Sequence, residues 1–238
     1  MDELLAAIPA RVKSSRFPRK LLQKIDGMPV IWHVWNSAIS ALGMDNVFIC
    51  SNDDEILLFF EGMWARTFKT SNLPRNGTER VFEFASASKA TEVLNIQADD
   101  PTVHKSLIRT IAEFSEWGSP VLTPIFRLKE IEKASNTNLV KVVTEKQGKA
   151  LYFSRSVIPH SRDGEPLEIW GHVGIYRYTM EALTKYMKIE PSQAETAEHL
   201  EQLRFLHGGI GVQTFETSFI PSPSESTDYL GNQQWTRQ

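Results

Sequence analysis

The chain has 238 residues, a formal net charge of -3, and 41% hydrophobic and 23% charged residues, which suits one large globular domain with a sizeable core. The near-neutral charge argues against general nucleic-acid binding, and the single cysteine, Cys50, excludes an intramolecular disulfide and a cysteine-cluster zinc site. The sequence shows no apolar stretch long enough to cross a membrane and no signal-peptide pattern, so we expect a cytoplasmic protein without a membrane partner.

The first half of the chain alternates between predicted strands and helices. Apolar runs predict strands at 4–10, 46–50, 65–69, 92–97 and 121–128. Helical spacing and capping residues predict helices at 29–42, from a cap at 51–54 to about 63, at 76–89 and at 102–117. This order predicts an α/β fold, with a mostly parallel, Rossmann-like sheet flanked by helices. Loops 11–20, 71–79 and 97–101 then fall at the carboxyl ends of strands, where ligands bind.

The second half is predicted to add a β-rich insertion. Segments 139–143 and 150–153 form a hairpin that turns at Gln147 and Gly148, and residues 154–171 leave the sheet. A strand at 172–178, helices at 179–187 and 195–206, and a strand at 210–215 follow. The tail from Pro221 has few apolar residues and is predicted to be loop, so the chain is treated as a single domain, 1–238.

A cationic loop follows the first predicted strand. Six basic residues and no acidic one lie between positions 11 and 24: Arg11, Lys13, Arg16, Arg19, Lys20 and Lys24. Charge alone favours a solvated surface loop or a nucleic-acid patch over a specific ligand site. Its position after a buried strand favours a polyanion site, such as one for a nucleoside triphosphate, whose oxygens Arg11 and Lys20 would neutralise.

Other charged and polar residues have two interpretations each. Asp99 and Asp100 follow the strand at 92–97, where a carboxylate can hold Mg²⁺ or cap the next helix; Asp100 could cap while Asp99 binds metal. Arg80 could bind a carboxylate or lie on the surface of its helix, and the surface position is favoured from the sequence. His172 lies in a predicted strand, where a structural role is slightly favoured.

Seven segments share their order and spacing with one enzyme family. They are 8–11 followed by Ser14, Arg16, Pro18 and Lys20; then 77–80, 95–101, 138–143, 150–159, 172–176 and 200–204. Together, over about residues 5–216, they resemble the 3-deoxy-manno-octulosonate (Kdo) cytidylyltransferases, also called CMP-Kdo synthetases. The resemblance implies transfer of CMP from CTP to a 3-deoxy-2-ulosonic acid, with release of pyrophosphate, in lipopolysaccharide biosynthesis.

The resemblance also implies roles for residues. The nucleotide would contact Ala10, Arg11, Ser14, Arg16, Lys20 and Thr78, of which Arg11 and Lys20, with Asp99, are the catalytic group. The acid sugar would contact Arg80, Gln97, Arg155, His172 and Gln202. Asp99 and a second acid would bind Mg²⁺. Residues 1–150 would form the nucleotide-binding part, 151–216 the sugar-binding insertion and 217–238 the tail. A homodimer with its interface near 155–172 is implied.

The chain departs from the family pattern in several places. Arg19 and Ala98 stand where the family has glycine, and Asn76 and Pro74 replace its serine and histidine. The late acidic motif that supplies the second metal ligand is altered, so that acid is either Asp228 or Glu225. Two other functions therefore stay open: a cytidylyltransferase for another acid sugar, such as a sialic or amino-ulosonic acid, and a degenerate homologue that binds nucleotide without turnover.

Overall fold

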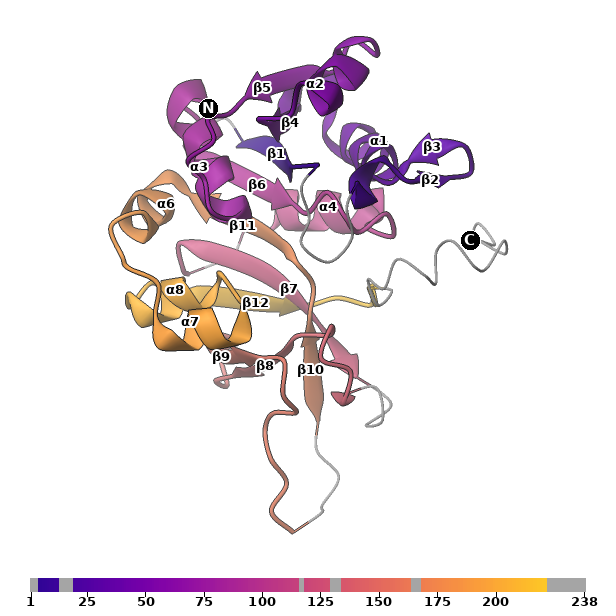
Figure 1. The fold of residues 1–238 in the computed structure, drawn as a ribbon. Helices are drawn as coiled ribbons and strands as arrows, with labels where there is room; N and C mark the ends of the chain where they lie inside the picture. The colour runs from indigo at the N-terminus through magenta and orange to yellow at the C-terminus, as the bar shows by residue number, and fades with distance from the viewer. Residues whose placement is uncertain (1–3, 13–18, 116–117, 129–133, 164–167, 222–238) are drawn as a thin grey trace.

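A ten-stranded sheet runs through the whole molecule (Figure 1). The computed structural model describes residues 4–12, 19–115, 118–128, 134–163 and 168–221. The strands lie in the order β5-β4-β1-β6-β11-β7-β10-β8-β9, and β12 pairs with β7. Their bounds are β1 Leu4–Ala10, β4 Val47–Ser51, β5 Arg66–Lys69, β6 Glu92–Ile96, β7 Val121–Leu128, β8 Lys141–Thr144, β9 Ala150–Ser154, β10 Ile169–His172, β11 Ile175–Thr179 and β12 Val212–Glu216.

The directions of the strands confirm a mostly parallel sheet. Strands β5, β4, β1 and β6 are mutually parallel neighbours, as the alternating pattern of the first half predicts. Beyond β6 the pairings become largely antiparallel, because β11, β10 and β9 run against the other seven strands of this sheet. The predicted hairpin is β8 and β9, and Gly148 in its turn has a φ of 82°.

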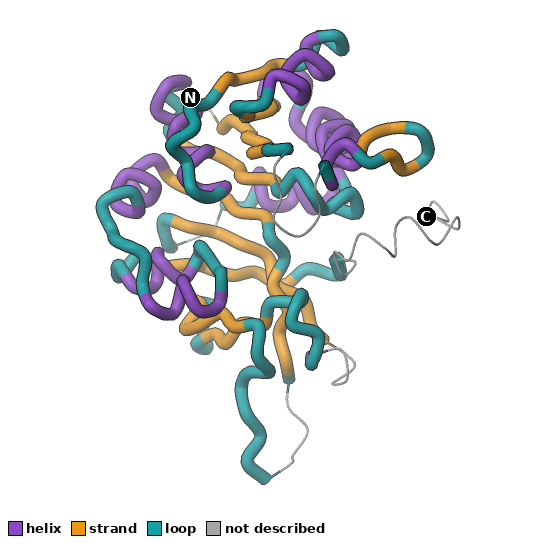
Figure 2. Tube along the Cα trace, in the orientation of Figure 1, coloured by secondary structure: helices purple, strands orange, loops and turns teal. Residues whose placement is uncertain are grey.

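Helices cover both faces of the sheet (Figure 2). One face packs against α1, α2 and α4, and the other against α3, α6 and α8. The helix bounds are α1 Val30–Leu42, α2 Asp54–Glu61, α3 Gly77–Ser88, α4 Lys105–Glu113, α6 Met180–Tyr186, α7 Gln193–Glu198 and α8 Leu203–His207. Short 3-10 helices span Lys20–Leu22 (η1) and Met44–Asn46 (η2). No helix of the described residues is long and apolar enough to span a bilayer.

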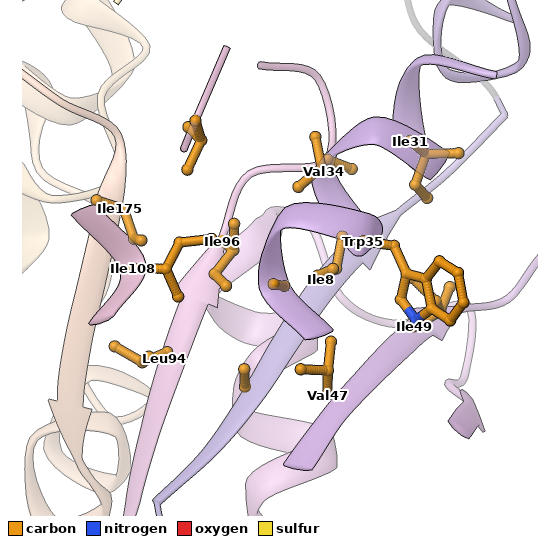
Figure 3. Close-up of a cluster of buried hydrophobic side chains, with 14 of the residues drawn as sticks. Ile8, Ile31, Val34, Trp35, Val47, Ile49, Leu94, Ile96, Ile108 and Ile175 are labelled. Atoms are coloured by element: carbon orange, nitrogen blue, oxygen red, sulfur yellow. The ribbon is translucent and has the colours of Figure 1, made fainter. Parts of the chain in front are cut away.

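Strand β1 divides the core between the two faces. Successive side chains of a strand point to opposite faces, so Ala6 and Ile8 pack toward α1 while Leu5 and Ala7 pack toward α3. Figure 3 shows Ile8 among the side chains of α1 and the neighbouring strands. The strand is nearly all apolar because both of its faces are buried, and this fixes the position of the loop that follows Ala10.

The predicted strand 172–178 is in fact two strands. β10 ends at His172 and β11 begins at Ile175. Both pair with β7, β10 with its second half and β11 with its start. Pro124 lies between these halves and has no amide hydrogen to donate, so a regular ladder is interrupted there; its carbonyl accepts from Val173 N at 3.1 Å.

The predicted helix 195–206 is also wrong as a single helix. It forms α7 and α8, separated at His199, which ends α7 in the left-handed region with a φ of 52°. Glu195 and Arg204 would lie on opposite faces of one continuous helix of 3.6 residues per turn. The break allows these two side chains to form a buried ion pair.

Three smaller differences concern the ends of two predicted segments and one additional hairpin. The predicted helix 102–117 begins later, at Lys105, because Asp100 accepts from Thr102 N in a separate turn and His104 caps α4. The excursion predicted for 154–171 is confirmed for the described residues up to 163, which project from the sheet in Figure 1, but strand β10 already begins at Ile169. A short hairpin, β2 Lys24–Ile25 and β3 Met28–Pro29, was not predicted, although its Asp26-Gly27 turn is a known hairpin signal.

Candidate active site

A cavity of about 260 Å³, here the smaller cavity, opens at the carboxyl ends of β1 and β6. All three loops that the sequence places at this edge contribute to it. Its lining residues are Pro9, Ala10, Arg11, Lys20, Leu21, Pro74, Asn76, Gly77, Arg80, Gln97, Ala98 and Asp99. Three of these side chains are cationic and one is a carboxylate, so the cavity suits a polyanion that also carries a metal ion.

Lys20 and Asp99 are in direct contact. Lys20 Nζ lies 2.9 Å from Asp99 Oδ2, in an ion pair between η1 and the loop after β6. The neighbouring Asp100 accepts from Thr102 N at 3.0 Å, and burial raises the pKa of its carboxyl group. Asp100 therefore holds a turn and does not cap α4, contrary to the predicted cap, whereas Asp99 lines the cavity and its metal role stays a prediction.

Asp99 can supply one ligand to a metal ion, but it cannot hold the ion alone. The part of the chain that the structure describes contains no group of three or more acidic, histidine or cysteine side chains placed to hold a metal ion. Mg²⁺ is commonly bound by one or two carboxylates together with substrate phosphates, so one aspartate in a cavity lined by cations fits that ion. Asp228 and Glu225, the alternatives for the second acid, lie outside the described residues.

A hydrogen bond joins the start of the basic loop to the N-terminus of α2. Val12 N donates to Asp53 Oδ2 at 2.7 Å, which holds the exit from β1 against the N-cap residue of α2. Ser14 and Arg16 lie outside the described residues. Arg19 has a φ of 60° and a ψ of 24°. This left-handed conformation favours glycine. The backbone conformation therefore explains why the family pattern has glycine at this position.

Arg80 is buried, which contradicts the surface position favoured from the sequence. It lies in the first turns of α3, and its Nη1 donates to the hydroxyl of Thr70. Burial lowers the pKa of the Arg80 guanidinium. Arg80 lines the smaller cavity beside Arg11 and Lys20, and not the larger cavity described below.

Thr78, assigned above to the nucleotide, points elsewhere. Its side chain is fully buried, with Oγ1 3.2 Å from the Tyr178 hydroxyl oxygen. Its backbone N donates to Glu201 Oε2 at 3.1 Å. Thr78 is not among the residues that line either cavity, so a direct nucleotide contact through it stays a prediction.

A second cavity of about 950 Å³, here the larger cavity, adjoins the first. It lies between the start of α3, the segment before β8 and the α7–α8 region. Its lining includes four of the five residues assigned to the acid sugar: Gln97, Arg155, His172 and Gln202. The two cavities share Arg11, Asn76, Gly77 and Gln97, so a group bound in one lies next to a group bound in the other.

His172 is a neutral, hydrogen-bonded side chain in the wall of the larger cavity. Its Nε2 lies 2.8 Å from Thr123 Oγ1, which is also 2.8 Å from the Ile175 carbonyl oxygen. Because the hydroxyl hydrogen is donated to a carbonyl, Thr123 accepts from the imidazole, and Nε2 carries the hydrogen. Burial lowers the pKa of His172 to about 3, so the imidazole stays uncharged at neutral pH.

Arg155 braces the loops that surround the larger cavity. Its Nε donates to the Glu198 carbonyl at 2.7 Å and its Nη1 to the Thr137 carbonyl at 2.9 Å. Its backbone N donates to Glu198 Oε2 at 2.8 Å. Gln202, next to the N-terminus of α8, is buried in the same wall. The structure thus brings these predicted residues together and gives Arg155 a structural role as well.

A charge network borders the larger cavity, which Arg75, Glu195 and Arg204 help to line. Arg204 donates to Glu195 Oε2 at 2.8 Å and to Glu79 Oε1 at 3.0 Å, and its guanidinium lies 4.3 Å from the centre of the Tyr186 ring. Arg75 also pairs with Glu79, at 2.8 Å. Burial opposes ionisation of Glu79, but hydrogen bonds from Arg75 and Arg204 outweigh it and lower the pKa. The network joins α3 to α7 and α8.

Two buried charges at this site were missed from the sequence. Arg204 is next to Leu203 in a predicted amphipathic helix, and Lys141 is the central residue of the apolar run 139–143. A charged residue inside an apolar strand pattern is the signal that identifies Lys141, because lysine is rarely fully buried without hydrogen-bonding partners. The signal for Arg204 is weaker, because only the break at His199 turns it inward.

Comparison with known proteins gives concordant matches. A family model described as cytidylyltransferase matches residues 5–214. A 3-deoxy-manno-octulosonate cytidylyltransferase of Myxococcus xanthus is 38% identical over 88% of this chain and 86% of its own length. One from Escherichia coli is 34% identical over 92% of this chain and 89% of its own length. A solved structure of a CMP:2-keto-3-deoxy-manno-octonic acid synthetase complexed with CTP is 34% identical, has a TM-score of 0.84, and matches over 90% of each chain.

Proposed function

Because this chain belongs to the cytidylyltransferase family, we propose that it transfers CMP from CTP to Kdo and releases pyrophosphate. The observation that carries the proposal is the pair of adjoining cavities with a shared wall. The smaller one is lined by the cations that a triphosphate requires, and the larger one by the residues assigned to an acid sugar. Relatives that carry the Kdo cytidylyltransferase name match over most of both chains.

The chemistry assigned to the smaller cavity is electrostatic. Arg11, Lys20 and Arg80 would balance the charge of the triphosphate, so that an anionic sugar can approach the α-phosphorus with less repulsion. Asp99 would hold Mg²⁺, which would supply further positive charge to offset that of the phosphates. In the free protein Lys20 pairs with Asp99, so binding of nucleotide and metal requires that this contact be exchanged for contacts to phosphate and to the ion.

The larger cavity is proposed to hold the sugar. His172, with its hydrogen on Nε2, keeps Nδ1 as an acceptor and adds no charge near neutral pH. The division into a nucleotide part, 1–150, and a sugar part, 151–216, is kept as a proposal. The larger cavity draws residues from both parts, including Asn138 and Gln202.

Homodimerisation and a cytoplasmic location are parts of the same proposal. Leu151 and Tyr152 on the edge strand β9, and Val157 in the excursion, are exposed apolar side chains. An exposed apolar edge strand is a template for pairing with another chain, which supports a dimer interface there. The cytoplasm supplies CTP, and a lone buried Cys50 is compatible with a reducing compartment.

The test is a pyrophosphate-release assay with Mg²⁺ across CTP, UTP and a panel of acid sugars. We expect turnover with CTP and Kdo and at most weak turnover with UTP. Turnover with a sialic or amino-ulosonic acid and not with Kdo would favour the second candidate function, which rests on Pro74 and Asn76 in the lining of the smaller cavity. CTP binding by calorimetry with no turnover on any acid sugar would contradict the proposal and identify a degenerate homologue.

A further inference from the structure

Lys141 is a fully buried cation at the centre of the sugar-binding half. It is the first residue of β8, lies opposite Ser154 of β9 and Gly171 of β10, and its side chain has no exposed surface. An ammonium group loses its hydration on burial and is costly to keep inside a protein. Burial accordingly lowers the pKa of Lys141. A methionine or leucine would fill a strand position more favourably, so the charge itself requires an explanation.

Three backbone carbonyls take all three ammonium hydrogens. Lys141 Nζ donates to the carbonyls of Leu139 at 2.7 Å, of Asn136 at 3.0 Å and of Arg155. None of these acceptors is a carboxylate, so the positive charge is solvated by dipoles and is not neutralised by them. The contacts join the turn before β8 to the chain that leaves β9.

Both joined segments form the wall of the larger cavity. Thr137, Asn138 and Val140 line it on one side of the ammonium, and Arg155 lines it on the other. Arg155 Nη1 in turn donates to the Thr137 carbonyl at 2.9 Å. Lys141 and Arg155 therefore cross-link the same two segments in opposite directions, and the two cations lie close to the same part of the cavity.

On the basis of the proposed function, we propose that Lys141 is a positioning residue for the acid sugar. Its carbonyl contacts hold Arg155 and residues 137–140 in the geometry that receives the sugar. It does not touch the smaller cavity. Loss of the ammonium should therefore affect the sugar selectively and leave the nucleotide site nearly unchanged.

The test is steady-state kinetics of Lys141→Met, which keeps the apolar stem and removes the three donors. We expect KM for Kdo to rise tenfold or more, with KM for CTP and kcat within about threefold of the unmodified enzyme. Lys141→Gln, which keeps two N–H donors, should raise KM for Kdo by a smaller factor and also leave KM for CTP and kcat nearly unchanged. It serves as the second variant if the methionine variant does not fold. Calorimetric titration of each variant with CTP alone should give an unchanged dissociation constant.

Arg177→Met is the matched control. Arg177, on β11, also donates to backbone carbonyls, those of Ala112 at 2.8 Å and Phe114 at 3.0 Å, but it lines neither cavity. Its loss should lower stability and active fraction without changing either KM. If Lys141→Met and Lys141→Gln behave in the same way as Arg177→Met, the positioning role is overturned. Absence of turnover in the unmodified enzyme would instead refute the proposed function.

Discussion

Removal of Arg204 should destabilise the protein far more than removal of Arg75, although both pair with Glu79. The Arg204 side chain is 2% exposed and the Glu79 side chain 4%, whereas Arg75 is 59% exposed. Arg204→Met leaves Glu195 buried without its cation, and loss of one partner of a buried pair costs about 3–5 kcal/mol. Arg75→Met breaks a solvent-exposed contact, for which we expect less than ~1 kcal/mol.

Urea denaturation at pH 7 measures both changes in the free energy of unfolding. The methionine stem preserves much of the packing on Tyr186, so the difference between the variants reports mainly on the uncompensated carboxylate. Arg204→Met combined with Glu195→Gln should recover more than half of the loss, because Glu79 retains Arg75 and no buried charge is then unpaired. A loss of less than about 1 kcal/mol in the free energy of unfolding for Arg204→Met would contradict this expectation. Equal losses for Arg75→Met and Arg204→Met would contradict it as well.

Three further changes test single residues. Arg19→Gly should raise the free energy of unfolding by about 0.5–1 kcal/mol, because relief of a left-handed backbone outweighs an exposed ion pair with Glu55; an equal gain for Arg19→Ala would contradict this. Because the pKa of His172 falls from 6.5 to about 3 on folding, stability should decline below pH 6.5 by up to about 1.4 kcal/mol per pH unit. In urea titrations at pH 7, 6 and 5, His172→Gln should remove this part of the pH dependence of the free energy of unfolding. The same pH dependence in the variant as in the unmodified protein would refute the expectation. Asp99→Asn should lower pyrophosphate release roughly 100-fold or more and raise the Mg²⁺ concentration needed for half-maximal activity; an unchanged Mg²⁺ dependence would exclude Asp99 as a ligand.

The sequence predicts the architecture well wherever a local pattern decides it. The apolar run of β1, the cap at Asn76 and the alternation up to Leu128 each reflect a local preference, and the corresponding elements form as expected. The strand break near Val173 and the helix break at His199 depend on partners distant in sequence, namely Pro124 of β7 and the buried pair formed by Arg204. No local pattern contains that information.

The same distinction applies to the site. Strand order alone brings the loops with Arg11 and Asp99 to one edge of the sheet, which is why their proximity could be predicted. The burial of Arg80 depends on its contact with Thr70 of another loop. The direction of the Thr78 side chain likewise depends on Tyr178, a hundred residues later. Side-chain orientation of this kind requires tertiary structure.

The wall shared by the two cavities has a kinetic consequence. With Arg11, Asn76, Gly77 and Gln97 bordering both, nucleotide and sugar can be bound at the same time and side by side. No nucleophilic side chain is then needed to carry the nucleotidyl group between separate half-reactions. Initial-velocity plots against one substrate, at several fixed concentrations of the other, should therefore converge and not run parallel.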